Sequence, residues 1–412
     1  MSTRFGPEAS AAEIRALAPP PPDVENDVRG IVQQVRDRGD AAVRELGERF
    51  GGAAVESLRV PQEELDAAAG SLERAVLEAL GVAVANVGAV AEAQLHEPVT
   101  VDLPQGQHVE VVEVPVRRAA AYVPGGRAPY PSTVVMCAVT ARAAGVEELA
   151  VCSPPGPDGH LHPAILAAAA LCGVAEVYAM GGAQGIAALA LGTESVPRVD
   201  VIVGPGNSYV QEAKRQLAGV VGIDGVAGPS ELVVVASEGA DPELVALDLL
   251  AQAEHGPDSL VVAIAPEGRL LDAIGARLAD GDGGGKGADA ALVQAADVPA
   301  ALALAEEIAP EHLQLVGGEA EALADAVRFA GCLFVGRDAG TAFGDYVAGS
   351  NHVLPTGGAA RFASSLGVAT FRRRMSRVSL PPGAAARLAP AGAALARTEG
   401  FSAHAESMER RA

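Results

Sequence analysis

The stretches VAEVYAMGGAQGIAALALG (174–192) and VDVIVGPGNSYVQEAKRQL (199–217) decide the fold. Each begins with an apolar run of β type, passes through a glycine turn and continues as a helical pattern. This order predicts a parallel sheet with helices on its faces. Ligands of such sheets collect at the carboxyl ends of the strands, where the turns GGAQG (181–185) and GPGN (204–207) lie. Free backbone amides in these turns would suit a phosphate, although neither turn matches the dinucleotide pattern G-x-G-x-x-G.

A second series of the same kind follows further along the chain. It has strand-type runs at 230–237, 259–266 and 331–336, and helical stretches at 242–255 and 298–307. We therefore expect a second α/β unit. The glycine-rich stretch DGDGGGKGA (280–288) between its parts is expected to be a flexible surface loop.

Outside these units the sequence predicts helices, one hairpin and a short tail. The predicted features are a stiff boundary at the proline run APPPP (18–22), helices over 23–50 and 61–95, and a β-hairpin over 99–116. The end of the chain is predicted to form a helix, a Pro/Ala linker and a tail. The composition of RTEGFSAHAES (397–407) by itself favours disorder, yet this tail contains Glu399 and His404.

Composition and charge indicate the class of protein and exclude some partners. Of the 412 residues, 49% are hydrophobic and none is tryptophan, so we expect a large aliphatic core. The net charge of −22 repels phosphate backbones, which argues against DNA or RNA as a partner. The basic run FRRRMSR (371–377) is interpreted as a solvated face or a subunit contact.

The sequence also favours a soluble, cytoplasmic protein. Its four cysteines are far apart and form no C-x-x-C pair, which is typical of free thiols in a reducing compartment. The N-terminus lacks the apolar segment of a secretion signal. The longest apolar run, 163–175, is too short to cross a bilayer, so no membrane association is expected.

The stretch DLLAQAEHGPDS (248–259) ends a helix with unusual residues. Asp241 and Pro242 are typical of a helix start, and Gly256-Pro257 of a helix end. Gln252 continues the apolar face of this helix, so we expect a half-buried amide that needs partners. His255 lies three residues further and can converge on the same point. From these residues alone, His255 is either a helix-capping side chain or, with Gln252, half of a metal site.

Two further stretches combine polar groups with turn residues. IAPEHLQLV (308–316) places Glu311 beside His312, an acid and a base suited to proton transfer and water activation, or an ordinary loop pair. TAFGDYVAGSNHVLPTGG (341–358) contains Asp345 and His352 and is either a site loop or a structural one. Tyr122, after the first predicted strand of its unit, would stack on a ring or pack in the core.

Together these stretches resemble the histidinol dehydrogenase family, the NAD-dependent zinc enzymes of histidine biosynthesis. The resemblance runs from about residue 25 to 407 and rests on seven motifs in order. They are AAYVPGG, GGAQGIAALALGTESVP, VGPGNSYVQEAKRQL, AGPSELVVVAS, LLAQAEHGPDS, APEHLQL and GDYVAGSNHVLPT. Seven motifs in order are far more specific than any one of them.

The resemblance implies roles for the matching residues. The implied zinc site holds one ion per subunit, and its implied ligands are Gln252, His255, Asp345 and His404. Of these, His404 would come from the other subunit of an intertwined homodimer. The implied contacts of L-histidinol are these four ligands together with Ser230, His312 and Glu399. The implied NAD contacts are Tyr122, Gln184 and Asn207. Zinc would orient the substrate, His312 would accept the alcohol proton and Glu311 would activate water for the second oxidation, which gives L-histidine.

The expected architecture is α/β, with two Rossmann-like parallel-sheet domains and small helical terminal segments. We expect an N-terminal helical arm (1–23), a first discontinuous domain (24–121 with 230–365), a second, NAD-contacting domain (122–229) and a C-terminal dimerisation arm (366–412). Two other functions remain open at this point. One is a related zinc dehydrogenase that acts on another amino alcohol or diol, and the other is a metal-binding scaffold without activity.

Overall fold

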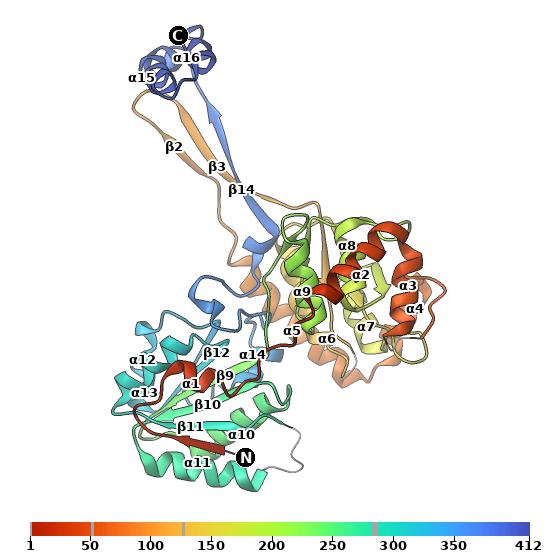
Figure 1. Cartoon of the computed structure of the whole chain (residues 1–412), viewed down its shortest axis with the longest axis vertical. Helices are drawn as coiled ribbons and strands as arrows, with labels where there is room; N and C mark the ends of the chain where they lie inside the picture. The colour runs from red at the N-terminus through yellow and green to blue at the C-terminus, as the bar shows by residue number, and fades with distance from the viewer. Residues whose placement is uncertain (1, 51–52, 126–127, 282–286) are drawn as a thin grey trace.

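The protein consists of two α/β lobes and a long arm that carries the C-terminus (Figure 1). This computed structural model describes residues 2–50, 53–125, 128–281 and 287–412. The predicted glycine-rich loop at 280–288 therefore lies largely outside the described residues. Both lobes contain the predicted parallel sheets, so the expected α/β class with two Rossmann-like units is confirmed.

The first lobe is built on a six-stranded sheet in which every described pairing is parallel. In spatial order its strands are β1 (Ser2–Phe5), β11 (Ala290–Gln294), β10 (Leu260–Ala265), β9 (Glu231–Ala236), β12 (His312–Val316) and β13 (Cys332–Val335). Its helices are α1 (Ala11–Arg15), α10 (Pro242–Ala253), α11 (Gly268–Gly281), α12 (Val298–Ile308), α13 (Gly318–Glu321) and α14 (Thr341–Tyr346). The central strands are fully buried, as expected for a parallel sheet covered on both faces.

The second lobe is built on a five-stranded parallel sheet. Its strands are β6 (Glu176–Ala179), β5 (Glu148–Ser153), β4 (Arg118–Tyr122), β7 (Val201–Val203) and β8 (Gly222–Ile223). Its helices are α2 (Glu25–Arg38), α3 (Asp40–Arg49), α4 (Gln62–Ser71), α5 (Arg74–Glu92), α6 (Pro131–Ala143), α7 (Pro163–Leu171), α8 (Gly182–Leu191) and α9 (Ser208–Leu217). Helix α5 has the length and apolar composition of a membrane-spanning helix, and here it packs along α6.

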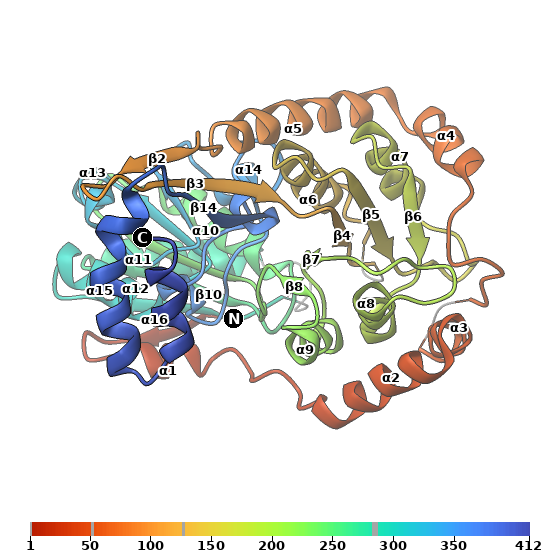
Figure 2. The ribbon, with the colours of Figure 1, turned by 90° about the horizontal axis from the view of Figure 1, so that it is seen from above.

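The arm combines an antiparallel sheet with two terminal helices. The predicted hairpin is formed by β2 (Val99–Asp102) and β3 (His108–Pro115), and β14 (Arg372–Ser379) pairs with β3 from the end of the chain. Helices α15 (Ala384–Thr398) and α16 (Ser402–Glu409) pack on each other at the far end of this sheet (Figures 1 and 2). Short 3-10 turns lie at Ala324–Ala326, Ala359–Arg361 and Val368–Phe371.

Two expectations about the domain boundaries differ from this arrangement. Helices α2 to α5 and strand β4 pack in the second lobe, whereas residues 24–121 were expected to group with 230–365. The first 23 residues are not purely helical, because β1 adds an edge strand beside β11. In both cases partners distant in sequence decide where a segment packs, and local composition does not record them.

In the C-terminal segment, the basic run is solvated along most of its length, as expected, but it also forms a strand that the sequence did not indicate. The basic run becomes strand β14 because its arginines face glutamates on β3: Arg374 lies 3.0 Å from Glu113 and Arg377 pairs with Glu110. The tail that composition assigned to disorder is the helix α16, where Ala405 packs against α15. An alanine contact joined by Met408, together with an ion pair between Arg397 and Glu409, connects this tail to α15.

Candidate functional site

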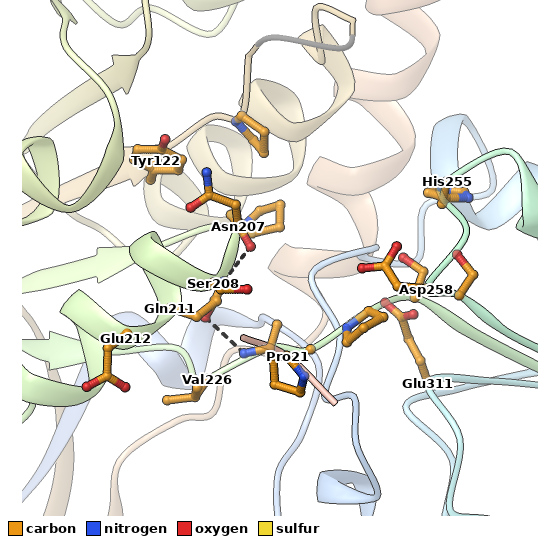
Figure 3. A pocket seen from close by; sticks show the side chains of 18 of the residues that line it. Pro21, Tyr122, Asn207, Ser208, Gln211, Glu212, Val226, His255, Asp258 and Glu311 are labelled. Atoms are coloured by element: carbon orange, nitrogen blue, oxygen red, sulfur yellow. Dashed lines mark hydrogen bonds between the residues drawn. The ribbon is translucent and has the colours of Figure 1, made fainter. Parts of the chain in front are cut away.

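A cleft between the two lobes contains most of the candidate residues. Its volume is about 950 Å³, which is within the range of small-molecule and cofactor sites. Figure 3 shows Tyr122 and Asn207 on one side of it and His255, Asp258 and Glu311 on the other. The proline run 19–22 also lines it, where the chain passes from α1 to α2.

The two lobes line this cleft with opposite ends of their strands. Tyr122 ends β4 and Asn207 follows β7, so the second lobe uses the carboxyl ends of its strands, as expected. Ser230 and Glu311 precede β9 and β12, and His312 is the first residue of β12. The first lobe therefore presents the amino ends of its strands, an arrangement that the carboxyl-end rule does not anticipate.

Glu311 and His312 are held by the chain just before and at the start of β12. Helix α12 ends at Ala309, whose φ of 48° places it in the left-handed region, and this turn brings Glu311 to the cleft. Glu311 and His312 are 6% and 4% exposed. Burial raises the pKa of Glu311 well above its ordinary value, and the nearby charges of Glu231 and Asp345 act in the same direction.

The hydrogen bonds of His312 select its tautomer. Its Nδ1 lies 3.0 Å from the backbone carbonyl oxygen of Glu231, which can only accept, so Nδ1 carries the proton. Burial lowers the pKa of His312 to about 4 and keeps the ring neutral. The lone pair is then on Nε2, which lies 3.8 Å from Oδ1 of Asp345. Nε2 is thus the ring nitrogen of His312 that faces Asp345, one of the implied ligands.

Of the four residues implied as zinc ligands, two line the cleft of this chain and a third lies close by in the sequence. His255 and Asp345 line the cleft, and Gln252 lies one helical turn before His255, at the end of α10. Gln252 is only 2% exposed, more buried than the half-buried position expected, and its Nε2 is a buried polar atom without a hydrogen-bond partner in the described part of the chain. The side-chain oxygen and nitrogen of an amide are assigned from their hydrogen bonds. A buried amide atom without a hydrogen-bond partner is a position at which a bound metal ion could supply the missing interaction.

The carboxylate of Asp345 is affected by its burial and by the neighbouring His255. Burial raises the pKa of Asp345 to about 6, and the charge of His255 works against this rise. Asp345 is further tied to the cleft by His352, whose Nδ1 lies 2.8 Å from its backbone oxygen. Within the described residues, no group of three or more His, Cys, Asp and Glu side chains is placed to hold a metal ion. One chain provides the amide of Gln252 and the side chains of His255 and Asp345, so a four-ligand zinc site would need one more ligand.

Glu399 and His404 lie at the end of the arm, away from the cleft of their own chain (Figure 1). Both are exposed, and the ring of His404 packs 5.2 Å from that of Phe401. The structure of one chain thus does not bring them to the other candidate residues.

The residues implied as NAD contacts are held by backbone interactions of the second lobe. The Tyr122 hydroxyl accepts a hydrogen bond from the Gly182 amide at 3.0 Å. Asn207 caps α9 by accepting one from Val210 N at 3.1 Å. Gln184 is buried in α8 and does not line the cleft. Two of the three implied residues therefore face the cleft in this structure.

Two residues next to the site were not indicated by any sequence motif. Glu231 contacts both Glu311 and His312, and Arg15 contacts Glu231. The signal for Glu231 was present: it is a charged residue at the start of the apolar run SELVVVAS, and buried carboxylates are paired. No local pattern indicated Arg15.

Comparisons with known proteins agree on one family. The histidinol dehydrogenase family model matches residues 19–412. The histidinol dehydrogenase of Parasynechococcus marenigrum (strain WH8102) is 44% identical over 398 residues, which cover 94% of this chain and 91% of the relative. That of Pseudomonas aeruginosa is 43% identical over 407 residues and covers the same shares. The crystal structure of histidinol dehydrogenase from Elizabethkingia anophelis has a TM-score of 0.93 and 29% identity, and the match covers 100% of this chain and 98% of that one.

Proposed function

Because the chain belongs to the histidinol dehydrogenase family, and is thereby an oxidoreductase of histidine biosynthesis, we propose that its cleft oxidises L-histidinol to L-histidine in two steps with NAD as acceptor. The first step removes a hydride and the alcohol proton and leaves an aldehyde. Water then adds, and the second step removes another hydride and proton to give the acid. The observation that carries the proposal is the adjacent pair Glu311 and His312 beside Asp345 in the cleft.

His312 is proposed as the base for the alcohol proton. Its Nδ1–H is engaged by the Glu231 carbonyl oxygen, so Nε2 is the nitrogen available to accept a proton. The lowered pKa keeps the ring in the neutral form that a base requires. The same ring would return to this form between the two oxidations by passing its proton to solvent.

Glu311 is proposed to activate the water that attacks the aldehyde. A carboxylate whose pKa is raised by burial is a stronger base than an exposed one, which suits removal of a proton from water near neutral pH. Its Oε2 accepts a hydrogen bond from Glu231 N at 2.8 Å, and this contact fixes the carboxylate in one orientation. In this proposal Glu311 takes a proton from water and His312 takes the proton of the alcohol.

The residues present fit a zinc ion and NAD. We propose Gln252, His255 and Asp345 as ligands of one zinc ion per subunit, completed by His404 from a second copy of the chain. The buried Nε2 of Gln252, which has no hydrogen-bond partner among the described residues, supports this set. When bound, zinc would hold the amine and imidazole nitrogens of the substrate in one orientation, and NAD would accept one hydride in each step. Ser230, with Glu399 of the same second copy, would contact the substrate, and Tyr122 and Asn207, which line the cleft, would contact NAD. Gln184, buried in α8, would reach NAD only if this lobe rearranges on binding.

We also propose a cytoplasmic homodimer with shared active sites. The supporting observation is the arm, which extends α15 and α16 away from the lobes and leaves Glu399 and His404 exposed at its end. The cleft of each chain lacks its own Glu399 and His404, so a second copy of the chain would supply them. The net charge of −22 supports the absence of nucleic-acid partners, and no membrane partner is proposed.

The test is the number of NADH molecules formed per L-histidinol consumed, measured with and without a chelator. A ratio of two that is lost on chelation and restored by zinc supports the proposal. A ratio of one would limit the activity to the first oxidation. No turnover of L-histidinol by the zinc-loaded protein would contradict the proposed substrate, and other amino alcohols and diols would then be screened.

A further inference from the structure

Glu231 contacts both proposed catalytic residues through three of its groups. Its backbone N–H donates to Glu311 Oε2 at 2.8 Å, and its carbonyl oxygen accepts from His312 Nδ1 at 3.0 Å. Its carboxylate accepts from Glu311 N at 3.2 Å and from Gly357 N at 2.9 Å. The last contact also ties it to the turn that follows His352. No side chain other than that of Glu231 is hydrogen-bonded to a backbone amide of Glu311 or His312 in the described residues.

The register of the sheet explains why these groups meet. Strands β9 and β12 are neighbours and parallel, and His312 pairs with Leu232. Glu231 and Glu311 therefore stand side by side at the entrance of these strands, with exposures of 4% and 6%. Two buried carboxylates at such a separation repel each other unless a cation compensates one of them.

Arg15 supplies this cation from the N-terminal segment. Its Nη1 and Nη2 lie 2.9 and 3.3 Å from the two carboxylate oxygens of Glu231, a two-pronged contact that fixes the plane of the carboxylate. Arg15 also donates to the carbonyl oxygen of Ile308 at the end of α12 through Nε, at 3.1 Å. That helix end leads directly to Glu311, so Arg15 holds both sides of the turn.

The position of Arg15 is itself fixed by the fold. Helix α1 begins at a capping box formed by Ser10 and Glu13, and Ile14 is fully buried against the six-stranded sheet. The guanidinium therefore projects from an anchored helix, which lowers the entropy lost when the contact forms. Arg15 lies before residues 19–412, the part of the chain that matches the family model.

We propose that Arg15 and Glu231 are positioning residues that hold Glu311 and His312 in their working orientation. Arg15 keeps the Glu231 carboxylate in place, and Glu231 in turn fixes the Glu311 backbone and carboxylate and the His312 ring. The N-terminal segment thereby becomes part of the active site without touching substrate. This inference rests on the proposed roles of Glu311 and His312.

The expected signature is a loss of kcat without a matching change in KM. Misplacement of a catalytic group by about 1 Å costs on the order of 100-fold, so we expect Glu231→Gln and Arg15→Gln to lower kcat by about 10- to 100-fold. The KM for L-histidinol and the zinc content should change little, because neither residue is among the proposed ligands. Arg15→Lys should recover only part of kcat, since an ammonium cannot make the two-pronged contact.

Matched controls separate positioning from general stability. Arg361 donates to the carbonyl oxygens of Glu306 and Glu307 at the end of the same helix α12 but makes no contact with Glu231. Glu176 begins a strand of the other sheet and pairs with Arg118. Arg361→Gln and Glu176→Gln should lower the midpoint of thermal unfolding and leave kcat unchanged.

The double variant tests whether Arg15 acts through Glu231. If it does, Arg15→Gln with Glu231→Gln lowers kcat no further than Glu231→Gln alone. Multiplicative losses, or variants that lose stability but keep wild-type kcat, would overturn the inference. Glu311→Gln and His312→Asn are measured in parallel. If these keep full turnover, the proposed function fails; if they abolish turnover while Arg15→Gln and Glu231→Gln retain it, only the present inference fails.

Discussion

At the scale of single residues, the site depends on which atoms of a side chain are already engaged. His312 is a base at Nε2 because Nδ1 is held by a backbone carbonyl, and Glu311 has a raised pKa because it is buried next to other carboxylates. Local sequence motifs indicated both residues but not their orientation, because their hydrogen-bond partner Glu231 lies in a strand 80 and 81 positions away.

The first prediction concerns this pair. His312→Asn or Glu311→Gln should lower kcat by about 100- to 10,000-fold, the usual contribution of a general base, while the thermal midpoint stays near that of the wild type. Steady-state NADH formation and thermal unfolding measure the two quantities. His160→Asn, which changes a largely exposed histidine outside the cleft, is the control and should keep full activity. Near-normal turnover of His312→Asn would refute its role as the base.

A second prediction concerns the buried amide of Gln252. Its Nε2 makes no hydrogen bond with described residues, so Gln252→Leu should leave the stability of the zinc-free protein unchanged or raise it by about 1 kcal/mol. The zinc content after purification, measured by atomic emission, should fall sharply.

The matched control for Gln252 is Gln314→Leu. Gln314 is equally buried but donates to Asp248 at 2.8 Å, so its replacement should cost stability and spare zinc. A Gln252→Leu protein that retains one zinc per subunit would remove Gln252 from the ligand set.

At the scale of elements, the strongest local patterns predicted the structure well. Helix α10 starts at the predicted cap Asp241, and the hairpin of β2 and β3 forms where the alternation indicated it. Weaker patterns gave no sign of a strand: β14 is exposed along almost its whole length and pairs with β3. An edge strand of this kind has no apolar periodicity of its own to detect.

A third prediction separates two roles of Asn207 at the start of α9. Its side chain caps the helix and faces the cleft. Asn207→Ser keeps a capping oxygen, so the thermal midpoint should hold while the KM for NAD rises. Asn207→Ala should lose about 1 kcal/mol of stability in addition. If both variants keep the wild-type KM for NAD, Asn207 caps the helix and has no part in cofactor binding.

At the scale of the whole molecule, the cleft and the arm end are far apart within one chain. The cleft lies between the carboxyl ends of the strands of one sheet and the amino ends of the strands of the other. The arm carries Glu399 and His404 away from it. An active site that needs both must be assembled from two copies.

The fourth prediction tests this assembly by complementation. His404→Ala and His312→Asn chains should each be inactive as homodimers. When they are unfolded together and refolded, about one quarter of the sites combine an intact cleft with an intact tail, so activity should return to about that fraction. Separately refolded variants that are mixed afterwards serve as the control. No recovery in the co-refolded sample would contradict the shared site.

The sequence by itself determined the α/β class, the family and most of the candidate site residues. These follow from local patterns: strand-turn-helix order, helix caps and short motifs whose residues are neighbours in the chain. The tertiary structure alone decided that residues 25–92 pack in the second lobe, that the first lobe presents its amino edge, and that Arg15 reaches Glu231. The reason is physical: these features depend on strand register and on contacts between distant segments, which no local pattern encodes.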